Sequence, residues 1–387
     1  MPVINRIAAL APEMTGWRRW LHRHPELEFN LPRTSEFVAE RLTEFGVDEL
    51  HRGIATSGMV ALIHGRAPGP VVGLRSDMDA LPIAEMTGAD WASENPGRMH
   101  ACGHDGHMAT LLGAAKYLAE TRNFAGTVAL IFQPAEEEGG GGEVMVREGI
   151  MDRFGIREVY GMHNAPNLPV GFIRTAPGPV MAAVDTLKVH LTGKGAHAAN
   201  PQLGVDPIPA MAAMVMALQT IVSRNAGALD ELVVSVTEIH AGTANNIIPE
   251  TGWFGATIRS FDPYIRDLAE DRIRAVIEGQ AASFGVAAQI GYQRGYPPTV
   301  NDPEKAHFAI DVAREVAGAD NVDDNAPRDM GAEDFSYMLE ARPGAFLFLG
   351  IGPGEGLHHP RYDFNDEALP VGASFFARLV ERALPIG

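Results

Sequence analysis

Cysteine is almost absent from this chain, with one in 387 residues, and a single cysteine excludes an internal disulfide framework. Basic residues are also few: 31 Lys and Arg stand against 49 Asp and Glu, and the formal net charge of −18 argues against nucleic acid and anionic membranes as partners. No apolar run reaches the roughly 18 residues of a membrane span, and no signal-peptide pattern opens the sequence. We therefore expect a soluble cytoplasmic protein.

The length and the composition bound the number of domains. At roughly 100–200 residues per domain, the chain predicts two domains or three. Hydrophobic residues make up 46% of the chain and charged residues 21%, which is typical of a globular protein with an ample core.

The only cysteine lies in a histidine-rich stretch, residues 99–107, whose sequence is MHACGHDGH. Cys102 and His104 are two positions apart, which suits a turned or extended loop better than one face of a helix. A thiolate and an imidazole are good ligands for a borderline-soft divalent metal ion. By itself, the stretch leaves a metal site and a solvated histidine-rich loop about equally open.

Further polar residues follow predicted strands at 71–75, 126–132, 158–162 and 345–349. Open α/β sheets carry their sites at the carboxyl ends of strands. Taken singly, each residue also fits a turn or a satisfied loop position. Their agreement favours a metal site, in which one glutamate binds the ion and its neighbour acts as a general base. The residues are Asp77, Asp79, the run Glu136-Glu137-Glu138, His163, and the pair His358-His359.

Helical periodicity and end signals predict the helices of this α/β part. One helix is expected to begin near Gly331. The others are expected at residues 3–22, 32–45, 108–119, 303–316 and 371–384.

The middle of the chain has a different pattern. Between about residues 185 and 292, the order strand, helix, strand, strand, helix, strand predicts a ferredoxin-like α+β domain. Prolines and glycines at 177–179 and 295–298 mark its hinges. We expect one domain from residues 1–182 plus 297–387, and an inserted domain from residues 183–296.

Three polar residues stand out in the inserted segment. His197 and Asn246 lie in two polar loops, and Arg259 lies on a predicted strand. Taken singly, they are interpreted as two turns and an exposed charge. The usual false-positive rate of short motifs favours this interpretation over a functional one by roughly two to one.

Eight short motifs then occur in order along essentially the whole chain. They resemble those of the aminoacylase, hippurate hydrolase and indoleacetyl-amino-acid hydrolase group of dinuclear metallo-amidohydrolases. The motifs are HPEL (24–27), DMDALP (77–82), HACGHDGH (100–107), QPAEE (133–137), GKGAHAA (193–199), NIIP (246–249), EDF (333–335) and LHHP (357–360).

The resemblance implies a fold and a metal centre. The fold is α/β, a mixed-sheet, metallopeptidase-like catalytic domain with an inserted ferredoxin-like lid, which commonly forms the contact of a homodimer. The centre holds two divalent ions, zinc or manganese first, with cobalt and nickel open. The implied ligands are Cys102, His104, Glu137, His163 and His358.

The resemblance also implies a reaction. Metal-bound hydroxide hydrolyses the amide bond of an N-acyl amino acid, hippurate-like or N-acetyl, to a carboxylic acid and a free amino acid. Glu136 matches the general base, and Asp79 is expected to orient a ligand from behind. His197, often lent by the partner subunit, and Asn246 match groups that hold substrate or oxyanion, and Arg259 matches a position that receives the substrate carboxylate.

Three departures and two alternatives stay open. Glu138 stands where many relatives have glycine, which leaves the register of the two functional glutamates open, and His359 leaves the ligating histidine open. Asp77 stands where the wider clan has a histidine ligand, which leaves the bridging ligand open. One alternative activity is that of a dipeptidase or a deacetylase of a biosynthetic N-acyl amino acid. The other is a non-catalytic binding protein on the same fold.

Overall fold

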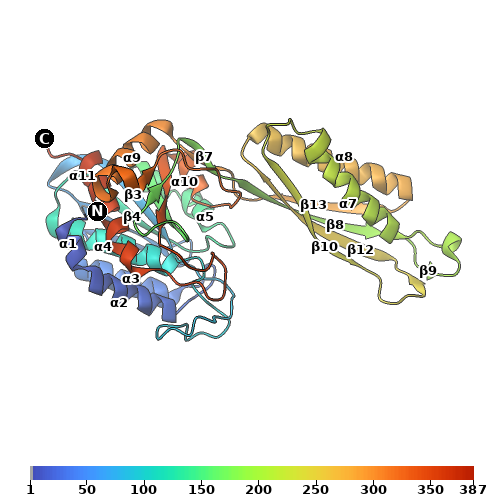
Figure 1. Ribbon diagram of the computed structural model, residues 1–387, viewed down its shortest axis with the longest axis horizontal. Coiled ribbons are helices and arrows are strands. Elements are labelled where there is room, and N and C mark those ends of the chain that lie inside the picture. Colours follow the sequence, from blue (N-terminus) through green and yellow to red (C-terminus); the bar gives the residue numbers. More distant parts are fainter. Residues whose placement is uncertain (1–2) are drawn as a thin grey trace. The chain divides into compact units, whose positions relative to one another are not determined.

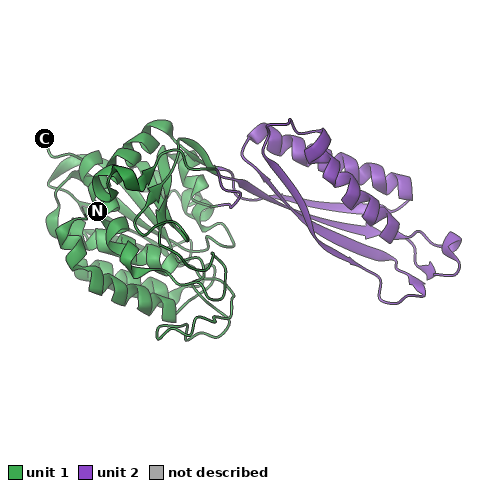
Figure 2. Ribbon diagram, viewed as in Figure 1, with its two compact units in different colours: residues 1–180, 299–327, 333–387 green, residues 181–298, 328–332 purple. Residues whose placement is uncertain are grey.

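The computed structural model describes residues 3–387 and divides them into two compact units (Figure 2). The larger unit comprises the residues up to Val180 together with Thr299–Pro327 and Glu333–Gly387, and the smaller unit comprises Met181–Pro298 and Arg328–Ala332. The short segment 328–332, which the sequence placed in the larger domain, thus clusters with the smaller unit.

The larger unit is built on an eight-stranded sheet with the order β1-β2-β4-β3-β5-β16-β6-β15 (Figure 1). Strands β4, β3, β5 and β16 run parallel to one another, and β1 and β2 are antiparallel additions at one side. The strands are β1 (Glu49–Ile54), β2 (Gly58–His64), β3 (Ala67–Asp77), β4 (Ala125–Gln133), β5 (Ile156–Ala165), β6 (Ile173–Arg174), β15 (Val322–Asp323) and β16 (Gly344–Gly350). A separate pair joins β7 (Gly178–Met181) to β14 (Thr299–Asn301).

Helices pack on this sheet around one core. Buried side chains of α2, α3, α4, α9 and α11 join those of the central strands in a single hydrophobic cluster. The helices are α1 (Asn5–Ala9), α2 (Ala11–Arg23), α3 (Pro32–Phe45), α4 (His104–Thr121), α5 (Gly141–Arg147), α6 (Ile150–Arg153), α9 (Pro303–Ala317), α10 (Ser336–Ala341) and α11 (Leu369–Ala383), with 3-10 turns at Ala319–Asn321 and Asp366–Ala368.

The smaller unit is a four-stranded antiparallel sheet with the order β10-β12-β8-β13 and two helices. Along β8 (Ala183–Thr192) buried and exposed residues alternate, because one face of the sheet packs on α7 (Pro207–Arg224) and α8 (Pro263–Phe284). The other strands are β10 (Leu232–Ala241), β12 (Thr251–Ser260) and β13 (Ala287–Arg294), and a short pair joins β9 (Ala196–His197) to β11 (Ile247–Ile248), with a 3-10 turn at Pro201–Leu203. The predicted fold class, a mixed α/β sheet with an inserted ferredoxin-like α+β domain, is confirmed.

Three helices begin with the same dipeptide, Asp-Pro. Asp206, Asp262 and Asp302 each accept a backbone N–H of the first turn of α7, α8 and α9, and each is followed by proline. The carboxylate satisfies an otherwise unpaired amide, and proline suits the first helical position because it has no N–H to satisfy.

Three predicted helices differ from the observed ones. The helix expected over 3–22 is broken at Leu10 into α1 and α2, because Pro12 has no N–H for the preceding turn. The helix expected from Met108 already begins at His104, so that the loop ends earlier than predicted. The helix expected near Gly331 begins only at Ser336, since Glu333 and Asp334 direct their side chains to a buried arginine instead.

The structure has no helix in residues 3–387 that is both long and apolar enough to cross a membrane.

Candidate metal centre

The polar residues expected at strand ends do meet at one edge of the large sheet. Asp77 ends β3, Glu136 and Glu137 follow β4, and His163 lies near the end of β5. These three strands are parallel neighbours, so their carboxyl ends share one edge. Cys102 reaches the same edge from the loop before α4.

Overlapping groups of potential metal ligands form there. In each group below, one ligand atom per residue lies within 4.8 Å of the others. The groups are Cys102-His104-His163, Cys102-Glu137-His358, His104-Glu136-Glu137, Asp77-His104-His107 and Glu136-Glu333-Asp334. The first three groups share members and together contain all five expected ligands and the expected base.

Hydrogen bonds orient two of the imidazoles. His104 Nδ1 lies 2.8 Å from the carbonyl oxygen of Asp79, and His163 Nδ1 lies 2.7 Å from that of Asn164. A carbonyl oxygen only accepts, so each Nδ1 carries a proton, and Nε2 is the atom of each ring that is left to bind a metal ion. Ligating histidines are held in this way by a partner behind the ring.

Two buried atoms at the centre make no hydrogen bond, although they face each other as an ion pair at 3.8 Å. Neither His104 Nε2 nor Glu137 Oε1 has a hydrogen-bond partner within residues 3–387. Buried polar atoms are nearly always satisfied, so this pair needs an explanation. A divalent cation satisfies both an imidazole lone pair and a carboxylate oxygen, and the donor set therefore fits a metal ion.

The pKa values at the centre agree with this fit. Burial raises the pKa of the Cys102 thiol well above its usual range, and Glu137 and Glu136 raise it further. Burial lowers the pKa of His104, but Asp77, Asp79 and Glu137 together outweigh burial and raise it to about 10. A bound cation favours the thiolate and displaces the imidazolium proton, so both groups are poised to exchange a proton for a metal ion.

Glu136 has the environment of a general base. It is buried, and burial, Glu333, Glu137 and Asp334 together raise its pKa well above the usual value. A carboxylate with a raised pKa accepts a proton from water more readily near neutral pH.

Asp79 holds Glu136 and Glu137 by their backbone. Its Oδ1 accepts the N–H of Glu136 at 3.0 Å, and its Oδ2 accepts the N–H of Glu137 at 3.1 Å. Its carbonyl oxygen also accepts from His104. One buried residue thus positions the expected base and two expected ligands.

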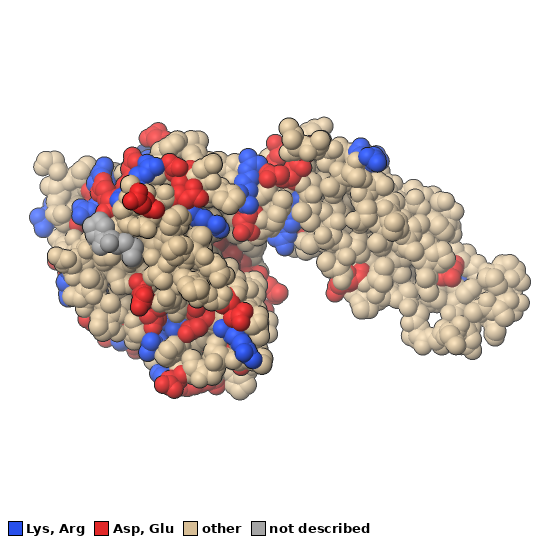
Figure 3. Space-filling model, viewed as in Figure 1, with Lys and Arg blue, Asp and Glu red and all other residues tan. Residues whose placement is uncertain are grey.

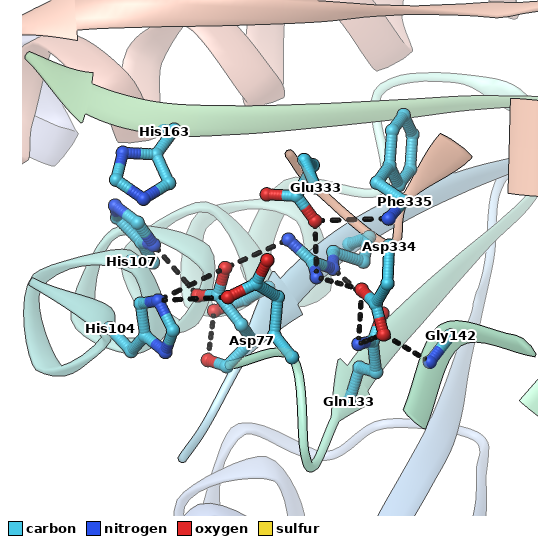
Figure 4. Close-up of polar contacts among 12 residues, drawn as sticks. Asp77, His104, His107, Gln133, Gly142, His163, Glu333, Asp334 and Phe335 are labelled. Atoms are coloured by element: carbon cyan, nitrogen blue, oxygen red, sulfur yellow. Dashed lines mark hydrogen bonds and ion pairs between the residues drawn. The ribbon is translucent and has the colours of Figure 1, made fainter. Parts of the chain in front are cut away.

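Sequence reasoning missed a buried arginine at this edge. Arg75 is 1% exposed and contacts Asp77 at 2.8 Å, Glu333 at 2.9 Å and Asp334 at 3.0 Å (Figure 4). Asp334 in turn accepts from Gln133 and from the backbone N–H of Gly142. The EDF motif marked Glu333 and Asp334 as members of a pattern, but the arginine had no signal beyond its place two residues before Asp77.

The sequence leaves two assignments open: the ligating histidine, His358 or His359, and the register of the glutamate run. The residues concerned differ in their surroundings. His358 Nε2 lies 3.4 Å from Glu137 Oε2, and its backbone N–H donates to the carbonyl of Ala101. His359 instead lies 3.8 Å from Glu355. Glu138 is exposed, whereas Glu136 is buried.

In the smaller unit, the structure brings two of the three expected residues together. His197 pairs with Ile247 across β9 and β11, and the carbonyl of Asn246 accepts the N–H of Ala198 at 3.0 Å. Arg259 lies eight positions along β12 from Thr251, about 26 Å from that end at 3.3 Å per residue. Thr251 pairs with Thr192, the last residue of β8, and β9, which carries His197, lies beyond this end of the sheet (Figure 1). Arg259 is therefore far from His197 and from Asn246, which is bonded beside it.

Known proteins resemble the chain over nearly its whole length. The pattern of peptidase family M20/M25/M40 matches residues 73–382. The chain is 41% identical to an N-acetyl-L-cysteine deacetylase of Bacillus subtilis, over 96% of this chain and 88% of that protein. It is 37% identical to the hippurate hydrolase of Campylobacter jejuni, over 99% and 100% of the two chains.

A solved structure shows the same likeness. The crystal structure of Bacillus subtilis YXEP, a dinuclear metal-binding peptidase of the M20 family, matches with a TM-score of 0.85 and 35% identity, over 97% of this chain and 99% of that one. The resemblance inferred from the eight motifs is thereby confirmed. The chain is a metal-dependent amidohydrolase and belongs to peptidase family M20/M25/M40.

Proposed function

We propose that the chain hydrolyses N-acyl amino acids to a carboxylic acid and a free amino acid at the edge of the large sheet. The observation that carries the proposal is the convergence of Glu136, a buried carboxyl group with a raised pKa, on a group of potential metal ligands in which His104 Nε2 and Glu137 Oε1 make no hydrogen bond. The named activities of the similar proteins, an N-acetylcysteine deacetylase and a hippurate hydrolase, support this class of substrate.

Two divalent ions would be held by Cys102, His104, Glu137, His163 and His358. When bound, such ions lower the pKa of water and polarise the acyl carbonyl. Thiolate and imidazole ligands favour zinc by softness. Metal analysis of the purified protein would distinguish zinc from manganese, cobalt and nickel.

The side chains of the protein perform the proton transfers. Glu136 takes the proton of the attacking water and later delivers it to the leaving amine. Asp79 keeps Glu136 in place through the backbone hydrogen bond described above. His197 and Asn246 stabilise the developing oxyanion. An intact base beside a complete ligand set disfavours the alternative of a non-catalytic binding protein.

Arg259 would receive the carboxylate of the amino-acid part. It is half-buried, burial lowers its pKa, and it forms no ion pair within residues 3–387. A guanidinium without an ion-pair partner suits the two oxygens of a carboxylate. The expected consequence is that Arg259→Met raises KM for N-acyl amino acids more than it lowers kcat.

A distance inside the smaller unit supports a homodimer. Arg259 lies about 26 Å from the Thr251 end of β12, farther than a small N-acyl amino acid extends, and His197 lies beyond that end. We therefore propose that His197 serves the partner's site. The helix α7 supports a contact of this kind, since it has no charged residue from Pro207 to Ser223 and exposes Met216 at 71%. Few charged side chains appear over this part of the smaller unit (Figure 3).

The test of function is the release of free amino acid from N-acetyl, N-benzoyl, indoleacetyl and dipeptide substrates, with and without a chelator. Release from N-acyl amino acids that the chelator abolishes and metal restores is expected. Preference for the dipeptides would identify a dipeptidase instead, and no release from metal-loaded protein would refute the proposal.

The test of the shared site is complementation between two inactive variants. Glu136→Gln and His197→Ala should each be inactive alone. Mixed dimers contain one site with both native residues, so mixing should restore activity. If both residues acted within one chain, the mixture would stay inactive.

A further inference from the structure

His107 is held on both sides of its ring. Nδ1 lies 2.7 Å from Asp77 Oδ1, and Nε2 accepts the backbone N–H of Asn164 at 3.0 Å. A backbone amide only donates, so Nε2 supplies its lone pair there and the proton resides on Nδ1, directed at Asp77. Neither nitrogen keeps a lone pair for a metal ion, although His107 lies within a possible ligand group with Asp77 and His104.

Asp77 is equally engaged. Its Oδ2 accepts from Arg75 Nη1 at 2.8 Å while its Oδ1 accepts from His107. Figure 4 shows Asp77 between the two histidines His104 and His107 on one side and Glu333 and Asp334 on the other. Arg75 and His107 therefore already balance the negative charge of Asp77.

The chain of hydrogen bonds continues through Asn164 to the proposed ligands. Asn164 Nδ2 donates to the carbonyl of Cys102 at 2.6 Å, and Asn164 Oδ1 accepts from the hydroxyl of Tyr362 at 2.9 Å. Its own carbonyl accepts from His163, as described above. A Cβ at Gly103 would collide with Asn164 Nδ2 and the Tyr362 hydroxyl, so only glycine permits this close approach.

The outcome is a specific spacing of two ligand atoms. Cys102 Sγ and His163 Nε2 lie 3.3 Å apart. Two such atoms on one tetrahedral zinc ion lie about 3.6 Å apart, from Zn–S and Zn–N bonds of about 2.3 and 2.05 Å. The pair is thus close to the arrangement that one ion requires, and both residues are held through Asn164.

We propose that His107 is a positioning residue and not a metal ligand: Asp77, His107 and Asn164 form a buried hydrogen-bonded chain that holds Cys102 and His163 at the spacing of one ion. The members are nearly inaccessible, with exposures of 0%, 6% and 2%. Hydrogen bonds are strong in such surroundings, and unmet groups there are costly. The proposal rests on the ligand set of the proposed function.

Cobalt titration of the metal-free protein tests it. The chain has one cysteine, so a thiolate-to-cobalt charge-transfer band reports on Cys102 alone. His107→Gln retains an acceptor for Asn164 but loses the donor to Asp77, and His107→Asn does the reverse. Both variants should reach the wild-type band and cobalt content at saturation, but at about 10- to 100-fold higher free cobalt.

Two further variants separate positioning from general destabilisation. Asn301 is a buried amide that accepts the N–H of Phe346 and donates to Thr175, with no bond to the proposed ligands. Asn301→Ala should lower the melting temperature and leave cobalt affinity unchanged. Tyr362→Phe removes the hydrogen bond to Asn164 at the far end of the hydrogen-bonded chain and should weaken cobalt binding several-fold. This variant keeps the test open if a His107 variant does not fold.

The outcomes are distinct. One fewer cobalt ion at saturation in the His107 variants would make His107 a ligand and overturn the proposal. Unchanged cobalt affinity in the His107 variants, or in Tyr362→Phe if these do not fold, would overturn it as well. A wild-type protein that binds cobalt without the thiolate band would overturn the ligand set itself, and with it the proposed function.

Discussion

Replacing Asp79 by asparagine tests how the active-site glutamates are positioned. The two carboxylate oxygens accept the N–H groups of Glu136 and Glu137 at 3.0 and 3.1 Å. Asparagine offers one oxygen, and its NH2 group faces the second N–H, which is left unpaired in a buried place. A hydrogen bond to a charged group contributes about 1.5–3 kcal/mol, and an unsatisfied buried donor costs a similar amount.

We therefore expect Asp79→Asn to lower the free energy of unfolding by about 3 kcal/mol. If the loop after β4 moves Glu136 to relieve the unpaired N–H, the loss appears mainly in kcat. About 1.4 kcal/mol corresponds to a factor of ten in rate. The expected fall in kcat is about 100-fold, with weaker metal retention through the displacement of Glu137. The assay is kcat and KM with the best N-acyl amino acid, together with metal content and the melting temperature.

Asp302→Asn is the matched control. Asp302 also accepts a backbone N–H, that of Lys305 at 3.0 Å, but it caps α9. Asparagine caps helices about as well as aspartate, so this variant should keep its activity. A kcat for Asp79→Asn within about threefold of wild type, in fully metal-loaded protein, would refute the reasoning.

Three further predictions follow from the site and its surroundings. Glu136→Gln should retain both ions but lose most turnover, by at least about 100-fold, because the amide cannot accept the water proton; metal analysis and kcat check this. His358→Ala should lower metal content and activity, whereas His359→Ala should leave both near wild type, because only His358 contacts Glu137. Although burial lowers the pKa of His22, Asp105 raises it to about 9. Its charged form therefore stabilises the folded protein below about pH 6.5, the ordinary value, and this contribution, on the order of 3 kcal/mol, is lost as the pH rises towards 9; melting of chelator-treated protein at pH 6 and pH 9 measures it, with His22→Gln as the reference.

Each of these has a contrary result. Wild-type turnover in Glu136→Gln would remove it as the base. Equal effects of the two histidine variants would leave the fifth ligand unassigned. The same loss of melting temperature between pH 6 and pH 9 in His22→Gln as in wild type would show that other groups cause it.

The sequence by itself determined the elements whose signals are local. Helical periodicity and end signals are of this kind, since a helix and the residues that start or stop it are neighbours in the chain. Strand patterns predict that Glu136 and His163 share a sheet edge, because parallel strands end together. The motif resemblance identified the family for the same reason: its residues lie in short segments that can be recognised one at a time.

The tertiary structure alone decided what depends on residues distant in the chain. Arg75 meets Glu333 across more than half of the sequence, and no periodicity encodes a contact of that kind. The choice between His358 and His359 depends on which ring faces Glu137, which adjacent positions do not reveal. The motif named His104 as an implied ligand and gave no role to His107, whose ring the fold directs into a hydrogen-bonded chain with Asp77 and Asn164. Long-range contacts and side-chain direction are properties of the packed molecule, and these separate the proposed ligands from the residues that hold them.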